Sequence, residues 1–142
     1  MEIETMQEEH TYQIGYKMGE AAEVGQVFCL SGDLGVGKTV FTKGFAAGLG
    51  FEDVSSPTFT IVNEYCGKYM IYHIDAYRLN SAYDAENIGI DEYISGNGVC
   101  VIEWAENIRE IIPKGAFWIT IAKDYSKDEN YRRINIEREG YK

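Results

Sequence analysis

The residues best suited to chemistry form a glycine-rich run at positions 32–39, with the sequence GDLGVGKT. Its spacing, G-x-x-x-x-G-K-[ST], is typical of a phosphate-binding loop, because the glycines let successive backbone N–H groups point into one concavity. An apolar run at 27–31 precedes the loop and a helical pattern follows it, so the concavity would open at a helix N-terminus, where anions bind well. We expect Lys38 to reach the β- and γ-phosphates of a nucleotide and the Thr39 hydroxyl to ligate Mg²⁺.

A loop of this kind needs a carboxylate at the end of a nearby strand, to hold Mg²⁺ or its waters and to orient an attacking water. Glu103 follows the apolar run 99–102, and Asp75 follows the run 70–74. We expect Glu103 to bind the metal and Asp75 to orient the water or to support the metal ligands. The sequence leaves open which of the two carboxylates orients the water.

Several other reactive or aromatic side chains have simpler structural interpretations. His73 is more typical of a packed strand histidine than of a catalytic base. Trp104 could cover a nucleotide, but an anchor in the core is the safer interpretation. Cys29 and Cys100 lie in apolar runs and are expected to be small buried hydrophobes rather than ligands or disulfides.

The polar stretch Ser55–Thr58 lies between the predicted phosphate-loop helix and a predicted hairpin. In nucleotide switches a loop at this position senses the γ-phosphate, although an ordinary surface turn is the alternative interpretation. The chain contains no [NT]-K-x-D stretch of the kind that GTPases use to bind guanine, and this absence favours ATP as the nucleotide.

The elements that position these residues follow from periodicity and from start and stop signals. Thr5 and Glu8 have the spacing of a capping box for the first helix. With no repeat or linker visible, residues 1–142 are expected to form one α/β domain of P-loop NTPase type, with three layers and a mixed parallel and antiparallel sheet. Helices are predicted at 7–23, 38–49, 81–94 and 105–112, and strands at 27–31, 60–65, 69–75, 99–104, 117–122 and 133–137, with 60–65 and 69–75 forming a hairpin.

Composition narrows the range of functions. The chain carries a formal charge of -10, from 23 acidic and 13 basic residues, and no basic cluster stands out. A protein that holds nucleic acid by itself needs clustered Lys and Arg, so direct RNA binding is not expected. The N-terminus lacks the pattern of a signal peptide and no run is long enough for a membrane helix, so a cytoplasmic location is expected.

Five strings of the sequence, taken in order, resemble one family. They are GDLGVGKT, SSPTFTIVNEY, YHIDAYRL, IGIDEY and VIEWAE. Together they are similar to the TsaE family, also called YjeE, the ATPase of bacterial tRNA threonylcarbamoyladenosine biosynthesis. The likeness runs from about residue 11 to residue 136. The family often has Pro after E-W where this chain has Ala105, and we expect only a local change in the following turn.

This resemblance implies an ATPase that uses ATP and Mg²⁺ while bound to two partners, TsaB and TsaD, of which TsaD transfers the carbamoyl group to the adenosine beside the anticodon. An acidic subunit could dock on a basic surface of such partners. The implied roles are phosphate binding by Leu34, Gly35, Val36, Gly37, Lys38 and Thr39; Mg²⁺ ligation by Thr39 and Glu103; a switch at Ser56, Pro57 and Thr58; a required carboxylate at Asp75; and adenine contacts from Met6–Glu8, including Glu8, and from Arg132 or Arg133.

Two other functions share the same loop. A small-molecule kinase would need a lid and clamping arginines, and the arginines of this chain form no evident lid cluster. A nucleotide-dependent binding switch would use the same Lys38 and Thr39 without requiring fast hydrolysis. No arginine finger is evident either, since Arg78 could serve as one or form a structural ion pair, so slow turnover is expected for the isolated chain.

Overall fold

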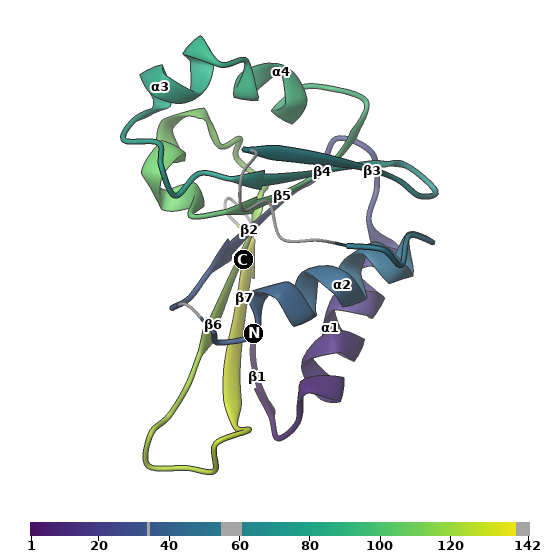
Figure 1. Ribbon diagram of the computed structural model, residues 1–142, viewed down its shortest axis with the longest axis vertical. Helices are drawn as coiled ribbons and strands as arrows, with labels where there is room; N and C mark the ends of the chain where they lie inside the picture. The colour runs from purple at the N-terminus through teal and green to yellow at the C-terminus, as the bar shows by residue number, and fades with distance from the viewer. Residues whose placement is uncertain (34, 55–60, 139–142) are drawn as a thin grey trace.

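The computed structural model describes residues 1–33, 35–54 and 61–138, and within them a seven-stranded sheet forms the centre of the fold. The strand order is β1-β7-β6-β2-β5-β4-β3 (Figure 1). The elements in chain order are β1 Glu2–Thr5, α1 Glu8–Ala21, β2 Val27–Ser31, α2 Lys38–Gly48, β3 Val62–Cys66, β4 Met70–Asp75, α3 Ala82–Asn87, α4 Ile90–Ile94, β5 Gly98–Glu103, the 3-10 helix η1 Ala105–Ile111, β6 Phe117–Ala122 and β7 Arg132–Arg138.

The predicted mixed sheet is confirmed. The four central strands β6, β2, β5 and β4 are parallel, and β3, β7 and β1 add antiparallel edges. The hairpin of β3 and β4 is also confirmed, with Val62 opposite Ile74. Parallel strands need crossover connections, and the helices that provide them cover both faces of the sheet.

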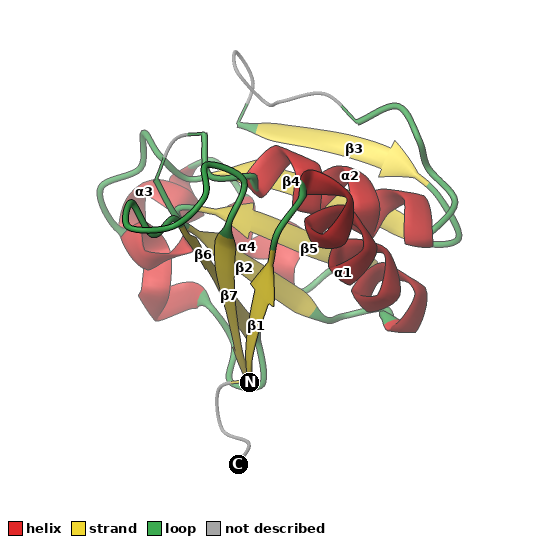
Figure 2. Cartoon of the chain, turned by 90° about the horizontal axis from the view of Figure 1, so that it is seen from below, coloured by secondary structure: helices red, strands yellow, loops and turns green. Residues whose placement is uncertain are grey.

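Alternation along the buried strands separates two hydrophobic cores. In β2, Phe28 and Leu30 face a cluster that includes Phe41 and Phe45 of α2. The intervening residues of β2 face a second cluster formed with α3, α4 and η1. Figures 1 and 2 show the resulting three layers, with α1 and α2 on one face of the sheet and α3 and α4 on the other. Burial on both faces explains why β2 is continuously apolar.

Helices α1 and α2 lie side by side and touch through glycines. Gly15 and Gly19 of α1 face Gly44 and Gly48 of α2 across the contact. A Cβ built at Gly19 would collide with the carbonyl oxygen of Phe45, and one at Gly44 with that of Tyr12. The missing side chains therefore let the two backbones approach each other directly, and this contact holds α2 against α1.

The first helix begins within one residue of its predicted start, but the capping box predicted at Thr5 and Glu8 is wrong. Thr5 is the last residue of β1, and α1 follows Gln7, which makes no side-chain cap. The Thr5 hydroxyl instead lies 3.2 Å from that of Thr11 and is buried. Strand β1 was not predicted, because four residues with two exposed glutamates give a weak signal; pairing with β7, in which Ile3 lies opposite Ile134, stabilises it.

Two other boundaries differ from the prediction. The helix expected at 81–94 is divided into α3 and α4, because Gly89 adopts a left-handed conformation with φ 81° at the start of α4. Strand β5 ends at Glu103 rather than at residue 104, since Trp104 has a φ of 60°. The turn after Trp104 is a 3-10 helix. None of the helices in the described part of the chain combines the length and apolar composition needed to cross a bilayer.

Replacing Gly44 with alanine should destabilise the protein. In a free helix this change would be favourable by about 1 kcal/mol, but here the new methyl group collides with the backbone of α1. We expect a loss of about 1–3 kcal/mol in the free energy of unfolding, measured by chemical denaturation. Lys43→Ala, at an exposed neighbouring position, is the control and should change stability by less than about 0.5 kcal/mol. A Gly44→Ala variant as stable as the wild type would contradict the close contact.

Native thiol labelling should detect one of the three cysteines. Cys66 is exposed, whereas Cys29 and Cys100 are buried. Burial raises the pKa of the Cys100 thiol to about 12, so at pH 9 it stays protonated in the folded protein, while an unfolded thiol with a pKa of about 8.5 is largely ionised.

The same shift makes the free energy of unfolding depend on pH. The stability that the Cys100 thiol contributes is complete below about pH 8.5 and is lost as the pH rises toward 12.

At pH 9, an aromatic disulfide reagent should therefore modify one thiol rapidly in the native protein and three after unfolding. Cys66→Ser is the control and should remove the rapid phase. Rapid modification of two thiols in the wild type would show that one of the buried cysteines is accessible.

Candidate functional site

Three parallel strands end side by side at one edge of the sheet. In the pairing of β2 with β5, Leu30 lies opposite Glu103, and in that of β4 with β5, Asp75 lies opposite Glu103. The glycine-rich loop follows β2 directly and leads into α2. Open α/β sheets bind ligands at this carboxyl-terminal edge. A cavity of about 310 Å³ lies here, lined by Glu8, Gly35, Gly37, Lys38, Thr39, Val40, Asp75, Glu103 and Trp104.

The glycines of the loop are required where the structure places them. Gly37 precedes α2 with a φ of 115°, a conformation that L side chains rarely adopt. A Cβ at Gly32 would lie 2.5 Å from the carbonyl oxygen of Ile121 in β6, so a side chain there would force the loop away from the sheet. The loop thus packs against the sheet and presents the first turn of α2 to the cavity.

Lys38 and Trp104 line the same cavity and contact each other there. Only 6% of Lys38 is exposed, and its Nζ lies 4.5 Å from the centroid of the Trp104 ring. Trp104 is the one described residue other than glycine with a positive φ, and Tyr77 packs edge-on against its ring at 5.0 Å. Trp104 packs against the core on the α3 and η1 side, as predicted, and it also lines the cavity beside Lys38.

The two carboxylates are held in different ways. Glu103 accepts a hydrogen bond at Oε2 from Nε2 of His73, at 2.8 Å, and its side chain is 14% exposed. Asp75 accepts the backbone N–H of Tyr77 at Oδ1, at 3.0 Å, which fixes the turn after β4. His73 is buried in β4 as predicted. Its bond to Glu103 was not foreseen, although the alternation of β4 places His73 and Asp75 on the same face.

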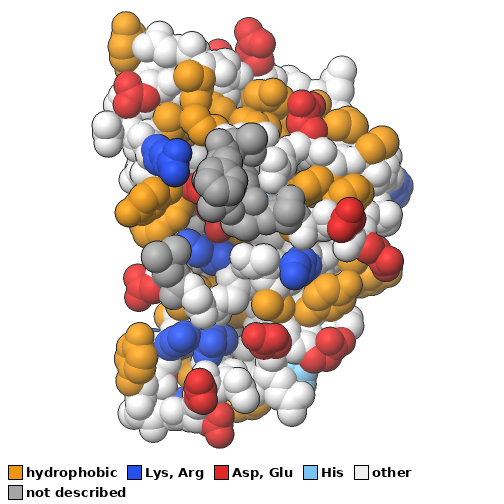
Figure 3. All heavy atoms as spheres, in the orientation of Figure 1, with side chains coloured by type: hydrophobic (Ala, Val, Ile, Leu, Met, Phe, Trp, Pro, Cys, Tyr) orange, Lys and Arg blue, Asp and Glu red, His pale blue; other side chains and the backbone are white. Residues whose placement is uncertain are grey.

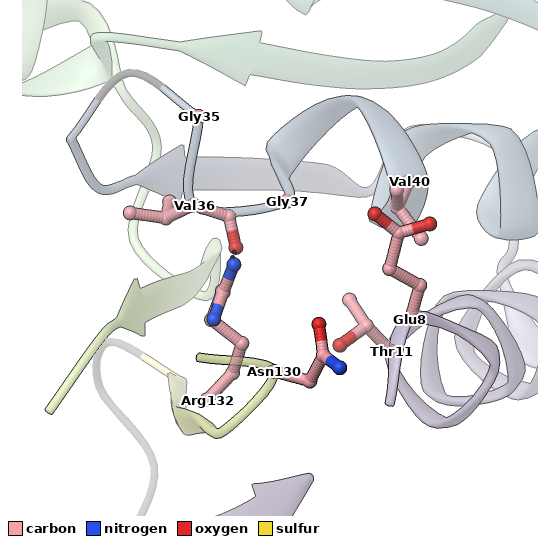
Figure 4. A pocket seen from close by; sticks show the side chains of 8 residues that line it. All are labelled: Glu8, Thr11, Gly35, Val36, Gly37, Val40, Asn130 and Arg132. Atoms are coloured by element: carbon pink, nitrogen blue, oxygen red, sulfur yellow. Dashed lines mark hydrogen bonds between the residues drawn. The ribbon is translucent and has the colours of Figure 1, made fainter. Parts of the chain in front are cut away.

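A smaller cavity of about 30 Å³ adjoins the first one and contains part of the predicted adenine region (Figure 4). Arg132 donates from Nε to the carbonyl oxygen of Val36, at 2.7 Å, and Glu8, Thr11 and Asn130 complete the wall. Arg132 also donates to two carbonyl oxygens near the start of β7. It thereby ties the glycine-rich loop to the end of the sheet.

The remaining candidate residues either line neither of these cavities or lie outside the described residues. Arg133 is exposed, lies opposite Glu4 in the sheet and lines neither cavity. Arg78 is exposed and forms no ion pair with another residue of the described ranges, so the structural ion pair considered for it is not found there. Leu34 and the predicted switch residues Ser56, Pro57 and Thr58 lie outside the described residues.

The donor set of the larger cavity suits a hard cation. Among the described residues, no three His, Cys, Asp or Glu side chains converge as they would around zinc. The Thr39 hydroxyl and the carboxylates of Asp75 and Glu103 line the same cavity, and all three are oxygen donors. Mg²⁺ prefers such ligands and usually takes only one or two from the protein, together with phosphate and water. The residues present therefore fit a Mg²⁺–phosphate complex.

Comparison with known proteins decides the family. Residues 5–134 match the model of the family described as "Threonylcarbamoyl adenosine biosynthesis protein TsaE". The chain belongs to the TsaE family. The five strings that suggested this family all lie within the matched residues, and the resemblance inferred from them is confirmed.

TsaE proteins of two bacteria are similar to this chain over most of its length. The tRNA threonylcarbamoyladenosine biosynthesis protein TsaE of Bacillus subtilis is 46% identical over 121 residues, which cover 84% of this chain and 75% of the relative. The protein of the same name from Treponema pallidum is 42% identical over 127 residues, covering 89% and 92%. The crystal structure of Bacillus subtilis YdiB superposes with a TM-score of 0.81 at 38% identity, covering 99% of this chain and 86% of that one. The predicted α/β fold of P-loop type agrees with this similarity.

Proposed function

We propose that this TsaE-family chain binds ATP with Mg²⁺ in the 310 Å³ cavity and hydrolyses it to support the formation of threonylcarbamoyladenosine in tRNA. The observation that carries the proposal is the convergence of Lys38, Thr39, Asp75 and Glu103 on one cavity. These four residues come from the glycine-rich loop and from two strand ends, and they supply a cation, a hydroxyl and two carboxylates. The relatives from Bacillus subtilis and Treponema pallidum are both named for tRNA threonylcarbamoyladenosine biosynthesis, and these names support the proposed role in that pathway.

Phosphate would be bound by the loop rather than by the charge of the protein as a whole. The net charge of -10 repels anions, so local donors must provide the attraction. The N–H groups at the start of α2 supply them, together with Lys38. For Lys38 to reach a phosphate it must leave the face of the Trp104 ring, a contact that contributes about 0.5–2 kcal/mol. A charge-assisted bond from Lys38 to phosphate, roughly twice as strong as a neutral hydrogen bond, would offset this cost.

Thr39 and Glu103 would hold Mg²⁺, which when bound neutralises charge on the β- and γ-phosphates. Asp75 is held at Oδ1 by the N–H of Tyr77, and its remaining lone pairs would orient the attacking water. Glu8 and Arg132 stand beside the loop, where the base and ribose of ATP would extend. The absence of a guanine-binding [NT]-K-x-D string supports ATP over GTP.

Partner proteins would supply what the chain lacks. We propose TsaB and TsaD as those partners and the cytoplasm as the location, on the basis of the family. On the face shown in Figure 3, Lys and Arg side chains lie in separate small groups among acidic and apolar ones. A surface of this kind is a poor match for the phosphate backbone of RNA. The tRNA would therefore be held by the partners, while this subunit handles the nucleotide.

The central test compares ATP hydrolysis by the isolated chain with hydrolysis in the presence of TsaB and TsaD. We expect slow turnover alone and marked stimulation by the partners, since an arginine finger or its equivalent contributes about 10³- to 10⁵-fold. Asp75→Ala and Glu103→Ala should each abolish the stimulated rate while nucleotide still binds, whereas Lys38→Ala should impair binding itself.

Three outcomes would contradict this proposal. Rapid hydrolysis by the chain alone would remove the need for partners. A Glu103→Ala variant that still supports tRNA modification would favour a binding switch over an ATPase. A phosphorylated small-molecule product formed without partners would indicate a kinase.

Binding can be followed through Trp104, because the chain has only two tryptophans. In a Trp118→Phe background, Mg·ATP should change the remaining emission in a saturable way, as Lys38 leaves the indole face. The change should be lost in the same background with Lys38→Ala at the same ATP concentration. A response that persists in Trp104→Phe and vanishes in Trp118→Phe would place the nucleotide elsewhere.

A further inference from the structure

A chain of hydrogen bonds runs across three strands and ends at Glu103. The Tyr65 hydroxyl in β3 lies 3.2 Å from Nδ1 of His73 in β4, and Nε2 of His73 lies 2.8 Å from Oε2 of Glu103 in β5. The strand register explains the path: Tyr65 pairs with Ile71 and Glu103 with Asp75, so each contact is a diagonal one on the same face of the sheet.

With His73 as a neutral imidazole, the donors and acceptors along this series of hydrogen bonds fit in one direction. Glu103 as a carboxylate only accepts, so the proton of the imidazole lies on Nε2, and Nδ1 then accepts from the Tyr65 hydroxyl. Tyr65 is itself 6% exposed and stacks on Phe51, with ring centroids 4.7 Å apart. His73 is 1% exposed. The donor that reaches Glu103 is therefore immobilised by packing on the side away from the cavity.

We propose that His73 is a positioning residue, which holds Glu103 in the orientation that binds Mg²⁺, and that Tyr65 fixes the ring of His73. The inference rests on the proposed Mg·ATP site. A carboxylate that accepts a hydrogen bond at Oε2 keeps its lone pairs on Oε1 for a cation. Glutamate has three rotatable bonds, so an unrestrained Glu103 would lose side-chain entropy on binding the metal. The bond from His73 removes that cost before the metal arrives.

The Thr39 and Glu103 oxygens that would bind the cation are held in position by different parts of the fold. The Thr39 hydroxyl is carried on the first turn of α2 and belongs to the phosphate loop. Glu103 stands at the tip of a strand, where its backbone continues into the strained Trp104. Within residues 1–33, 35–54 and 61–138, the side-chain partner found for Glu103 is the buried His73. The contact therefore acts on metal binding and not on binding of the phosphates by the loop.

The test measures the affinity for ADP in EDTA and the affinity of the protein–ADP complex for Mn²⁺ by electron paramagnetic resonance. His73→Leu, which keeps a buried apolar side chain but has no donor, should weaken Mn²⁺ binding about 10-fold or more. The affinity for ADP in EDTA should stay within about twofold of the wild type, because the phosphate loop is untouched. His73→Gln places an amide N–H near the position of Nε2 and should restore most of the Mn²⁺ affinity.

A matched pair of tyrosine variants tests the outer link. Tyr65→Phe keeps the stacking on Phe51 but loses the hydroxyl, and it should weaken Mn²⁺ binding about threefold. Tyr72→Phe is the control, since Tyr72 belongs to the opposite face of β4 and packs on Tyr93. It should leave the Mn²⁺ affinity unchanged. This pair keeps the proposal testable if His73→Leu fails to fold.

A double-mutant cycle separates positioning from general stability. If His73 acts through Glu103, adding His73→Leu to Glu103→Gln should weaken Mn²⁺ binding no further than Glu103→Gln alone. Full Mn²⁺ affinity in His73→Leu, equal losses in His73→Leu and His73→Gln, or additive losses in the double variant would each overturn the positioning role. Failure of the wild type to bind Mn²⁺ together with ADP would instead reject the proposed Mg·ATP site.

Discussion

The parallel pairing of β2, β5 and β4 is the constraint on which the site depends. Parallel strands place all their carboxyl ends at one edge, so a loop after β2 necessarily meets the last residues of β5 and β4. The register then selects the side chains: Asp75 lies opposite Glu103, and His73 lies two residues earlier on the same face. A shift of β4 by one residue would turn His73 and Asp75 toward α3 and η1, away from Glu103 on β5. The packing of the hydrophobic cores and the assembly of the site therefore require the same strand register.

The contact between α1 and α2 adds a second constraint from the other side of the loop. Because glycines let the two helix backbones touch, the start of α2 is held close to the start of α1. Glu8, the first residue of α1, therefore lines both cavities beside Gly37. The phosphate loop is thus bounded by the sheet on one side, through Gly32 and Ile121, and by a helix pair on the other.

Local patterns predicted most of the architecture, and their failures have physical causes. Continuous apolar runs identified β2 and β5, because strands buried on both faces admit few polar residues. The short strand β1 escaped detection, since its stability comes from pairing with β7, more than a hundred residues away. Gly89 divided a predicted helix because its φ of 81° is incompatible with a continuous one. Neither long-range pairing nor dihedral angles can be obtained from periodicity.

The site was predictable in its residue types more than in its contacts. Motif spacing identified Lys38 and Thr39, the ends of two apolar strands identified Asp75 and Glu103, and the structure places all four around one cavity. The bond from His73 to Glu103 requires knowledge of which strands are neighbours, and a single sequence does not provide it. Likewise, the positive φ of Trp104 turns an aromatic residue out of a strand and toward Lys38. Tertiary context decided both outcomes.

The hydrogen bond from Arg132 to the Val36 carbonyl has a consequence for the order of events during synthesis. It joins positions that are 96 residues apart, and among the described strands β1 pairs with β7 alone, at the opposite end of the chain that the structure describes. Contacts of such long range form slowly, because a large loop must close before they contribute. A growing polypeptide that has already left the ribosome as far as β6 still lacks the guanidinium that ties down the glycine-rich loop. The hydrogen bond from Arg132 to the glycine-rich loop can therefore form only after the start of β7 has been translated.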